Sequence, residues 1–70
     1  MGKLQELANQ NGVLVDTLIA EAAFEDVVAG ICMNPHCDYT TDVEPDQRAD
    51  WCEQCGTYTV KSCLVLAGLA

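Results

Sequence analysis

The N-terminal residues carry apolar side chains at helical spacing. Leu7 and Ala8 follow Leu4 by three and four positions, which places all three on one face of a helix. Asn and Gly come next, and Gly12 can adopt the left-handed conformation that commonly ends a helix. The pattern therefore predicts a short helix over residues 3–10, followed by a turn.

A second stretch of helical spacing begins near Asp16 or Thr17. Either side chain can accept hydrogen bonds from the free amides of a first helical turn. Gly30 then marks the expected end of the helix. We therefore expect residues 1–30 to form a helical hairpin. The apolar side of its second helix comprises Leu18, Ile19, Ala22, Ala23 and Val27.

From residue 38 onward the spacing changes to that of a strand. Tyr39, Thr41 and Val43 alternate with polar residues, as in a half-exposed strand. Residues 44–46 (EPD) favour a turn. Residues 57–60 (TYTV) are β-prone and are expected to pair back against the first strand.

Residues 61–70 are apolar on nearly every side. Ser62 can cap a helix, so this segment is expected to be a short helix or a strand, buried in this chain or in a partner. No apolar run approaches the roughly 20 residues that span a bilayer, and we expect no membrane insertion.

Two pairs of cysteines lie within and beside the strand region. The pairs have the spacings C-x4-C and C-x2-C and are separated by fourteen residues. Such pairs form two turns that bring four sulfurs to one ion, and tetrahedral closure leaves no coordination site for substrate. The expected metal ligands are Cys32, Cys37, Cys52 and Cys55. The expected cofactor is one structural Zn²⁺; iron remains open, because tetrahedral sulfur suits it as well.

Other roles for these side chains are open but less favoured. His36 can replace Cys32 or Cys37 in a mixed site, although a solvent-facing loop histidine is the preferred interpretation. Cys52 and Cys55 can instead form a redox dithiol, but the surrounding sequence lacks the βαβ pattern typical of such dithiols. Cys63 lies in the apolar tail, where we expect a buried small hydrophobe rather than a fifth ligand or redox thiol.

The metal completes the expected fold. A 70-residue core seldom contributes more than about 3–5 kcal/mol, so such chains usually need a metal, a disulfide or a partner. We expect a single small α+β domain over residues 1–70. It consists of the helical hairpin, a four-cysteine zinc ribbon with short antiparallel strands over residues 31–60, and the apolar C-terminal segment over residues 61–70.

The cysteine-bearing segments resemble a zinc ribbon. They are residues 32–39 (CMNPHCDY), 43–46 (VEPD) and 51–56 (WCEQCG). They are also similar to small zinc-ribbon proteins of bacteriophages and proteobacteria that generally have no assigned function. This resemblance covers roughly residues 30–69 and implies metal roles for the four cysteines. Many zinc ribbons are scaffolds in nucleic-acid-binding proteins, but this chain lacks their basic residues.

The net charge of the chain limits the classes of binding partner that we expect. The net charge is −8, with Lys3, Arg48 and Lys61 as the basic residues. A four-thiolate zinc site adds two negative charges, giving roughly −10. Three scattered cations cannot build a phosphate-binding patch. The acidic excess indicates either solubility alone or attraction to a basic protein surface. The acidic groups considered for that surface are Glu21, Glu25, Asp42, Glu44, Asp46 and Asp50.

Two interpretations involving nucleic acid are alternatives to a protein-binding surface. The order of residues 7–18 is similar to a helix-turn-helix, but its second helix offers acids instead of Lys or Arg. Trp51 is expected to cover the metal site or the sheet; alternatively it stacks on bases. A nucleic-acid-binding ribbon would use Trp51, Tyr39, Tyr58, Arg48 and Lys61.

No catalytic constellation is present in the sequence, and we expect no enzymatic activity. Residues 1–7 are amphipathic and lack the continuous apolar stretch of a secretory signal, so a cytoplasmic location is expected, where thiols stay reduced. The favoured function is a protein-protein interaction module that binds a basic, nucleic-acid-handling protein. A homodimer through Leu64, Val65, Leu66 and Leu69 is a further alternative.

Overall fold

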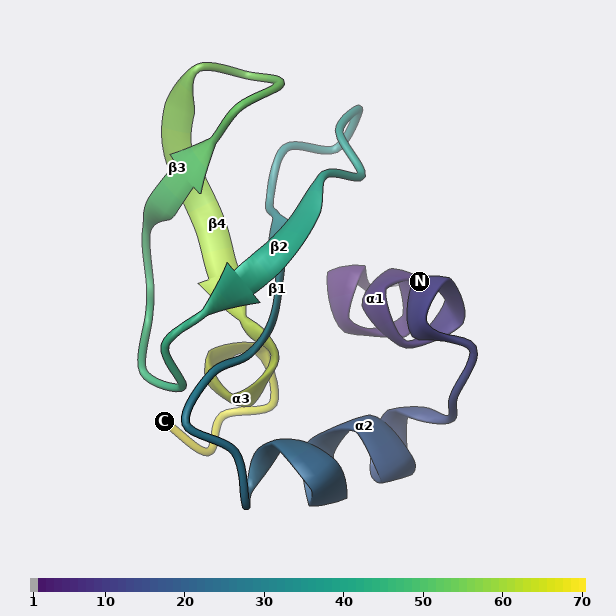
Figure 1. The fold of residues 1–70 in the computed structure, drawn as a ribbon. Coiled ribbons are helices and arrows are strands. Elements are labelled where there is room, and N and C mark those ends of the chain that lie inside the picture. The colour runs from purple at the N-terminus through teal and green to yellow at the C-terminus, as the bar shows by residue number, and fades with distance from the viewer. Residues whose placement is uncertain (1) are drawn as a thin grey trace.

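Four antiparallel strands form a sheet in the order β2-β1-β4-β3, with helices beside and below it (Figure 1). The computed structural model describes residues 2–70. The elements in chain order are α1 (Lys3–Asn11), α2 (Val15–Ala22), β1 (Val28–Cys32), β2 (Thr40–Val43), β3 (Asp50–Cys52), β4 (Thr57–Ser62) and α3 (Cys63–Leu66). The predicted α+β fold, with two N-terminal helices, antiparallel strands and clustered cysteines, is confirmed.

Helix α1 forms where the apolar spacing predicts it. Leu7 and Ala8 are fully buried, and Leu4 packs against the same core. Gly12 ends the helix with a φ of 70°, a left-handed conformation that costs glycine little. The Asn11 side chain donates to the Leu7 carbonyl at 2.8 Å, which satisfies one free acceptor of the last turn.

Helix α2 is shorter than predicted. It starts at Val15 after an N-cap at Leu14 that makes no side-chain cap bond, so neither Asp16 nor Thr17 caps it. It ends at Ala22, and the predicted end at Gly30 is wrong because Gly30 lies inside strand β1.

A glycine at position 30 suits a strand between two neighbours. A Cβ there would lie 2.8 Å from Val43 Cγ2 and 3.0 Å from the Lys61 carbonyl oxygen. Only a residue without a side chain therefore permits this close approach of β2 and β4 to β1.

The sheet order also corrects the predicted pairing. Strand β4 pairs with β1 and β3, while β2 pairs with β1 alone. The expectation that residues 57–60 pair with the strand near Tyr39 is wrong, because β1 lies between them. The predicted second helix extends to Gly30, so the sequence pattern predicts no strand over residues 28–32, which lie in the middle of the sheet.

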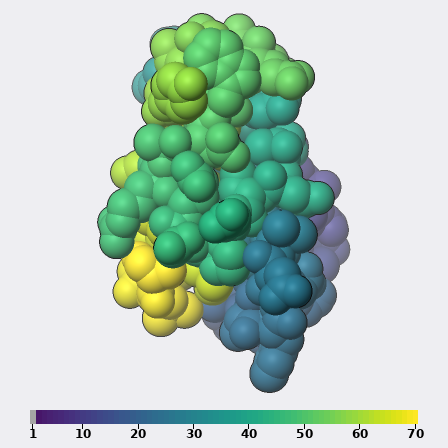
Figure 2. All heavy atoms as spheres, turned by 60° about the vertical axis from the view of Figure 1, so that its left-hand side comes forward, coloured from purple at the N-terminus to yellow at the C-terminus, as the bar shows by residue number. Residues whose placement is uncertain are grey.

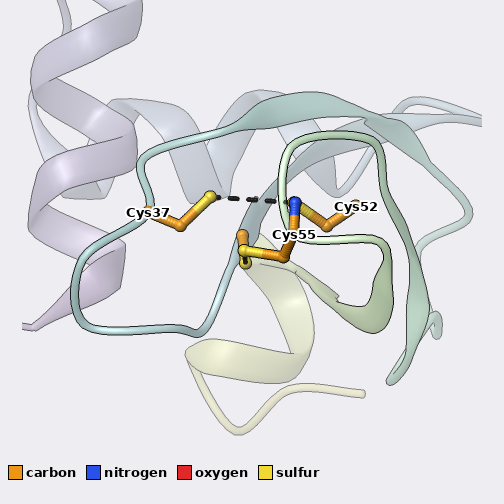
Figure 3. A group of neighbouring side chains, drawn as sticks. Cys37, Cys52 and Cys55 are labelled. Atoms are coloured by element: carbon orange, nitrogen blue, oxygen red, sulfur yellow. Dashed lines mark hydrogen bonds between the residues drawn. The ribbon is translucent and has the colours of Figure 1, made fainter.

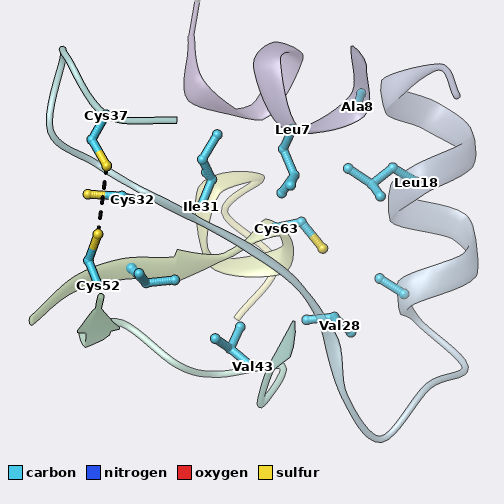
Figure 4. Packing of buried hydrophobic residues seen from close by; sticks show 12 residues of the cluster. Leu7, Ala8, Leu18, Val28, Ile31, Cys32, Cys37, Val43, Cys52 and Cys63 are labelled. Atoms are coloured by element: carbon cyan, nitrogen blue, oxygen red, sulfur yellow. Dashed lines mark hydrogen bonds between the residues drawn. The ribbon is translucent and has the colours of Figure 1, made fainter. Parts of the chain in front are cut away.

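The core lies between the sheet and the helices (Figure 4). Helices α1 and α3 pack against β1, and α2 packs against α1 and α3. Leu7, Ile31, Val60 and Cys63 are fully buried. None of the helices within residues 2–70 has the length and apolar character needed to cross a membrane.

The C-terminal segment is a short helix capped by Ser62, as one of the two predicted alternatives stated. The buried Ser62 hydroxyl accepts from the Val65 N–H at 3.1 Å and donates to the Pro45 carbonyl at 2.6 Å. Residues 64–66 are half-buried, whereas Leu69 is 67% exposed. The segment is thus only partly covered by this chain.

Candidate metal centre

Four sulfurs meet at one end of the sheet. Cys32 ends β1 and Cys52 ends β3, and each strand is followed by a loop that returns a second cysteine, Cys37 or Cys55. We call these loops the first knuckle (residues 33–39) and the second knuckle (residues 53–56). The four Sγ atoms lie within 4.8 Å of one another. Figure 3 shows the side chains of Cys37, Cys52 and Cys55 close together.

The sulfur separations fit a metal site. Cys32 Sγ lies 3.8 Å from Cys55 Sγ, and Cys37 Sγ lies 3.7 Å from Cys52 Sγ. A tetrahedron with metal–sulfur bonds of about 2.3 Å has edges of about 3.8 Å, whereas a disulfide needs about 2.05 Å. All five cysteines carry free sulfurs. The cluster therefore has the spacing of a four-thiolate site.

Local hydrogen bonds shape both knuckles. In the second, the Gly56 N–H donates to the Cys52 carbonyl at 2.8 Å and the Cys55 N–H points to Cys52 Sγ at 3.4 Å. Gly56 has a φ of 68°, which explains the glycine directly after Cys55. In the first, the Cys37 N–H donates to the Asn34 carbonyl at 3.1 Å, which closes the turn around Pro35.

Side-chain donors surround the sulfurs. The Thr59 hydroxyl lies 3.1 Å from Cys32 Sγ, and Asn34 Nδ2 donates to Cys55 Sγ at 3.1 Å. Hydrogen bonds to bound thiolates offset their negative charge and orient the ligands. The sequence pattern places Thr59 only in a strand and assigns Asn34 no contact with a ligand, so neither contact with sulfur was predicted.

Two of the thiols have pKa values displaced in opposite directions. Burial opposes ionisation of Cys32, but hydrogen bonds from the Thr59 hydroxyl and the Asn34 backbone outweigh it and lower the pKa of Cys32 to about 6. A backbone hydrogen bond from Tyr39 lowers the pKa of Cys37, but burial and the neighbouring thiols raise it to about 12. Four adjacent thiolates repel one another, so full ionisation requires a bound cation.

Helix α1 holds the first knuckle against the rest of the protein. Lys3 Nζ donates to the Cys37 carbonyl and lies 3.4 Å from Glu6 Oε2. Gln10 Nε2 donates to the Asp38 carbonyl at 3.0 Å. The Lys3 side chain is 12% exposed, so its positive charge is held close to the sulfur cluster. No spacing rule in the sequence connects this lysine with Cys37, which is 34 residues away.

The other candidate residues lie outside the sulfur cluster. His36 is exposed in the first knuckle and is not among the grouped ligands, which agrees with the preferred reading of a loop histidine. Cys63 is fully buried in the hydrophobic core, as predicted, near Leu7 and away from the sulfurs (Figure 4). Burial raises the pKa of Cys63, which disfavours a reactive thiolate.

Trp51 covers part of the second knuckle. Its ring lies 4.0 Å from the position of a Cβ on Gly56 and makes an edge-to-face contact with Tyr58, with centroids 5.2 Å apart. Trp51 remains 44% exposed and Tyr58 69% exposed. The expected cover is therefore present over one knuckle, and the aromatic pair also faces solvent.

Together, fold and site define a class: a small α+β protein with four clustered cysteines that can hold a metal ion. No family model matches the chain, and no curated protein or solved structure matches it. The zinc-ribbon resemblance consequently rests on the cysteine spacing and the paired knuckles of this chain.

Proposed function

We propose that Cys32, Cys37, Cys52 and Cys55 hold one structural Zn²⁺ and that the zinc-held ribbon is a non-enzymatic protein-interaction module. The observation that carries the metal assignment is the pair of sulfur separations, 3.7 and 3.8 Å, at the edge length of a thiolate tetrahedron. Four thiolates fill that tetrahedron. With no open position for water or substrate, the metal supplies stability rather than catalysis.

A basic protein is the proposed partner. The net charge of −8 supports electrostatic attraction, and the one ion pair within residues 2–70 joins Lys3 to Glu6. The remaining acidic groups are therefore available to a partner. The resemblance to phage and proteobacterial ribbons motivates a nucleic-acid-handling protein, whose basic surface this chain would occupy in place of nucleic acid.

Elemental analysis tests the metal assignment. Protein expressed without added metal should carry one zinc per chain. One iron per chain would instead assign iron to the site. Changing Cys52 to Ser should lower the metal content, and the matched change of Cys63 to Ser should leave it near one because Cys63 lies outside the cluster.

Affinity capture tests the partner. Zinc-loaded protein should retain the same partner from lysate of its own host with and without nuclease, and the purified pair should dissociate as salt rises. Charge reversal at Glu44 and Asp46 should slow association. Binding that changes with neither salt concentration nor charge reversal would contradict a basic partner.

The exposed aromatic pair supports a second candidate, a nucleic-acid-binding ribbon. Trp51 and Tyr58 offer ring faces, and Lys61 lies on the same strand as Tyr58. This candidate predicts that nuclease removes the captured material and that Lys61→Gln weakens binding to single-stranded oligonucleotides at low salt. Arg48, the other expected cation, donates to the Ala70 carbonyl at 3.3 Å.

A further inference from the structure

A groove runs between α2 and β2. Its larger part has a volume of about 380 Å³ and lies between the end of α1, α2 and the start of β1. A second hollow of about 300 Å³ shares Asn11, Ala29 and Asp42 with the first and continues along Thr40 and Thr41. We call the two together the α2–β2 groove. Its elongated course suits an extended chain segment better than a compact ligand.

The groove has both apolar and polar lining. Leu18, Ala22 and Val28 are buried and line it from α2 and β1. Val27 lines it as well and is 51% exposed. Phe24, directly before groove-lining Glu25, is 93% exposed. An uncovered phenylalanine and valine beside this hollow form the kind of surface that a partner covers.

Three carboxylates also line the groove. Glu21 and Glu25 come from α2 and the turn after it, and Asp42 faces them from β2, where it pairs with Ala29. Among residues 2–70, no Lys or Arg lines the groove. Lys3 is engaged at the first knuckle and Arg48 at the C-terminus, so neither neutralises these three acids.

The charge selects one class of occupant. A second copy of this chain carries the same −8, and nucleic acid or an anionic membrane surface would be repelled by the three carboxylates. A cationic protein segment gains attraction to the rim and burial of an apolar side chain at once. Figure 2 shows the blue residues after α2 at the lower tip of the molecule, below the teal and green of the β2 region, where a partner can approach.

We propose that the α2–β2 groove binds a short extended segment of a basic protein, with an aliphatic side chain against Val27 and Lys or Arg residues beside Glu21, Glu25 and Asp42. This inference rests on the proposed function and locates its binding site. The acids of the β2–β3 turn, Glu44 and Asp46, then contribute only long-range attraction.

Two peptides of equal charge test the apolar component. The zinc-loaded, nitrogen-15-labelled protein is titrated with acetyl-Lys-Leu-Lys-Leu-Lys-amide and with acetyl-Lys-Gly-Lys-Gly-Lys-amide at low salt. The leucine peptide should bind about tenfold more tightly, because burial of one leucine side chain supplies at least that factor. Its largest shifts should fall on the amides of Ala22, Val28 and Ala29.

Matched charge variants test the rim. Glu21→Gln with Glu25→Gln removes two groove acids, and Glu44→Gln with Asp46→Asn removes two acids of the β2–β3 turn. All four side chains are exposed, so both variants should fold. The groove variant should weaken the leucine peptide about tenfold. The turn variant should weaken it less than threefold, because those charges act only at long range.

The outcomes separate the two proposals. Equal affinity for both peptides, or equal weakening by both variants, would overturn the groove while leaving attraction to basic proteins intact. If the chemical shifts of the groove amides change with protein concentration in the absence of peptide, the occupant of the groove is a second copy of the chain and not a basic segment. Binding of neither peptide at low salt would overturn the groove and the basic partner together.

Discussion

Ser62 joins three parts of the protein through one side chain and one amide. Its hydroxyl caps α3 and binds the Pro45 carbonyl, and its N–H donates to the Gln47 carbonyl at 3.0 Å. The β2–β3 connection and the last helix are therefore attached to β4 at the same residue. Since Ser62 is fully buried, water cannot replace these partners.

Ser62→Ala should consequently lower the free energy of unfolding by about 1–3 kcal/mol, because it removes a cap and leaves the Pro45 carbonyl without its donor. Urea unfolding of the zinc-loaded protein measures this change. Thr17→Ala is the matched control: Thr17 is exposed and caps nothing, so a change below about 0.5 kcal/mol is expected. Equal losses in the two variants would contradict the role of Ser62.

Thr59 affects the metal through the sulfur it contacts. Thr59→Val keeps the shape of the side chain but removes the hydroxyl 3.1 Å from Cys32 Sγ. Zinc affinity should fall about tenfold, the lower end of the range for lost partners of metal ligands. Competition with a chromogenic chelator gives the affinity, and Thr41→Val on β2 provides a control that should bind zinc like the unmodified protein.

The displaced pKa values predict how zinc affinity depends on pH. Zinc binds thiolates, so affinity rises with pH by one power of ten per pH unit for each proton displaced. The raised pKa of Cys37 means that this thiol is protonated in the neutral range before the ion binds.

Zinc affinity should therefore rise with pH across pH 5–8, because thiols release protons when they bind the ion. Chelator competition across this range measures the curve. An affinity that does not change with pH would contradict zinc binding by thiolates.

Among the elements, the two strand-knuckle-strand units depend most directly on the metal. Strand β3 has three residues, and the candidate metal ligands lie in the knuckles or at the strand ends beside them. A structural zinc site contributes roughly 10–16 kcal/mol, more than a core of this size supplies. Without zinc, β3 and both knuckles should lose their order.

EDTA treatment should therefore abolish the dispersed amide signals of residues 50–60 and shift Trp51 fluorescence toward that of exposed indole. Re-addition of zinc should restore both signals. Cys63→Ser, whose sulfur lies outside the cluster, should respond to EDTA in the same way as the unmodified protein. Strand signals that survive EDTA would show that the helices and core suffice for folding.

The elements also differ in how well the sequence predicts them. The spacing of Leu4, Leu7 and Ala8 predicts α1, because the amphipathic pattern of a single helix is local in the sequence. Strand β1 is not a local pattern: Ala22 and Ala23 extend the helical signal, and Gly30 is equally typical of a helix end. Its strand conformation depends on pairing with β2 and β4, residues that follow it in the chain.

The candidate site was the most predictable part of the protein, because two short cysteine turns impose their geometry locally. Its surroundings were not predictable. Lys3 and Thr59 reach the site only through tertiary packing, and nothing in their sequence neighbourhood connects them with Cys37 or Cys32.

For the whole molecule, the uncovered C-terminus bears on self-association. Leu69 is 67% exposed, and the homodimer suggested by the apolar tail remains a prediction. If the dimer forms, sedimentation equilibrium should give twice the chain mass at high salt, where charge repulsion is screened, and Leu69→Lys should return the monomer. A Leu69→Lys protein that stays dimeric would place the contact elsewhere.

The attachment of α1 to the first knuckle has a consequence for regulation. Lys3 and Gln10 grip the metal end, and Asn11, at the end of the same helix, lines the α2–β2 groove. If zinc and a basic segment both bind, ordering of α1 by one would favour the other, and the two equilibria would be linked. A cell short of zinc would lose the partner-binding form before it lost the polypeptide, so metal supply would act as a switch on the interaction.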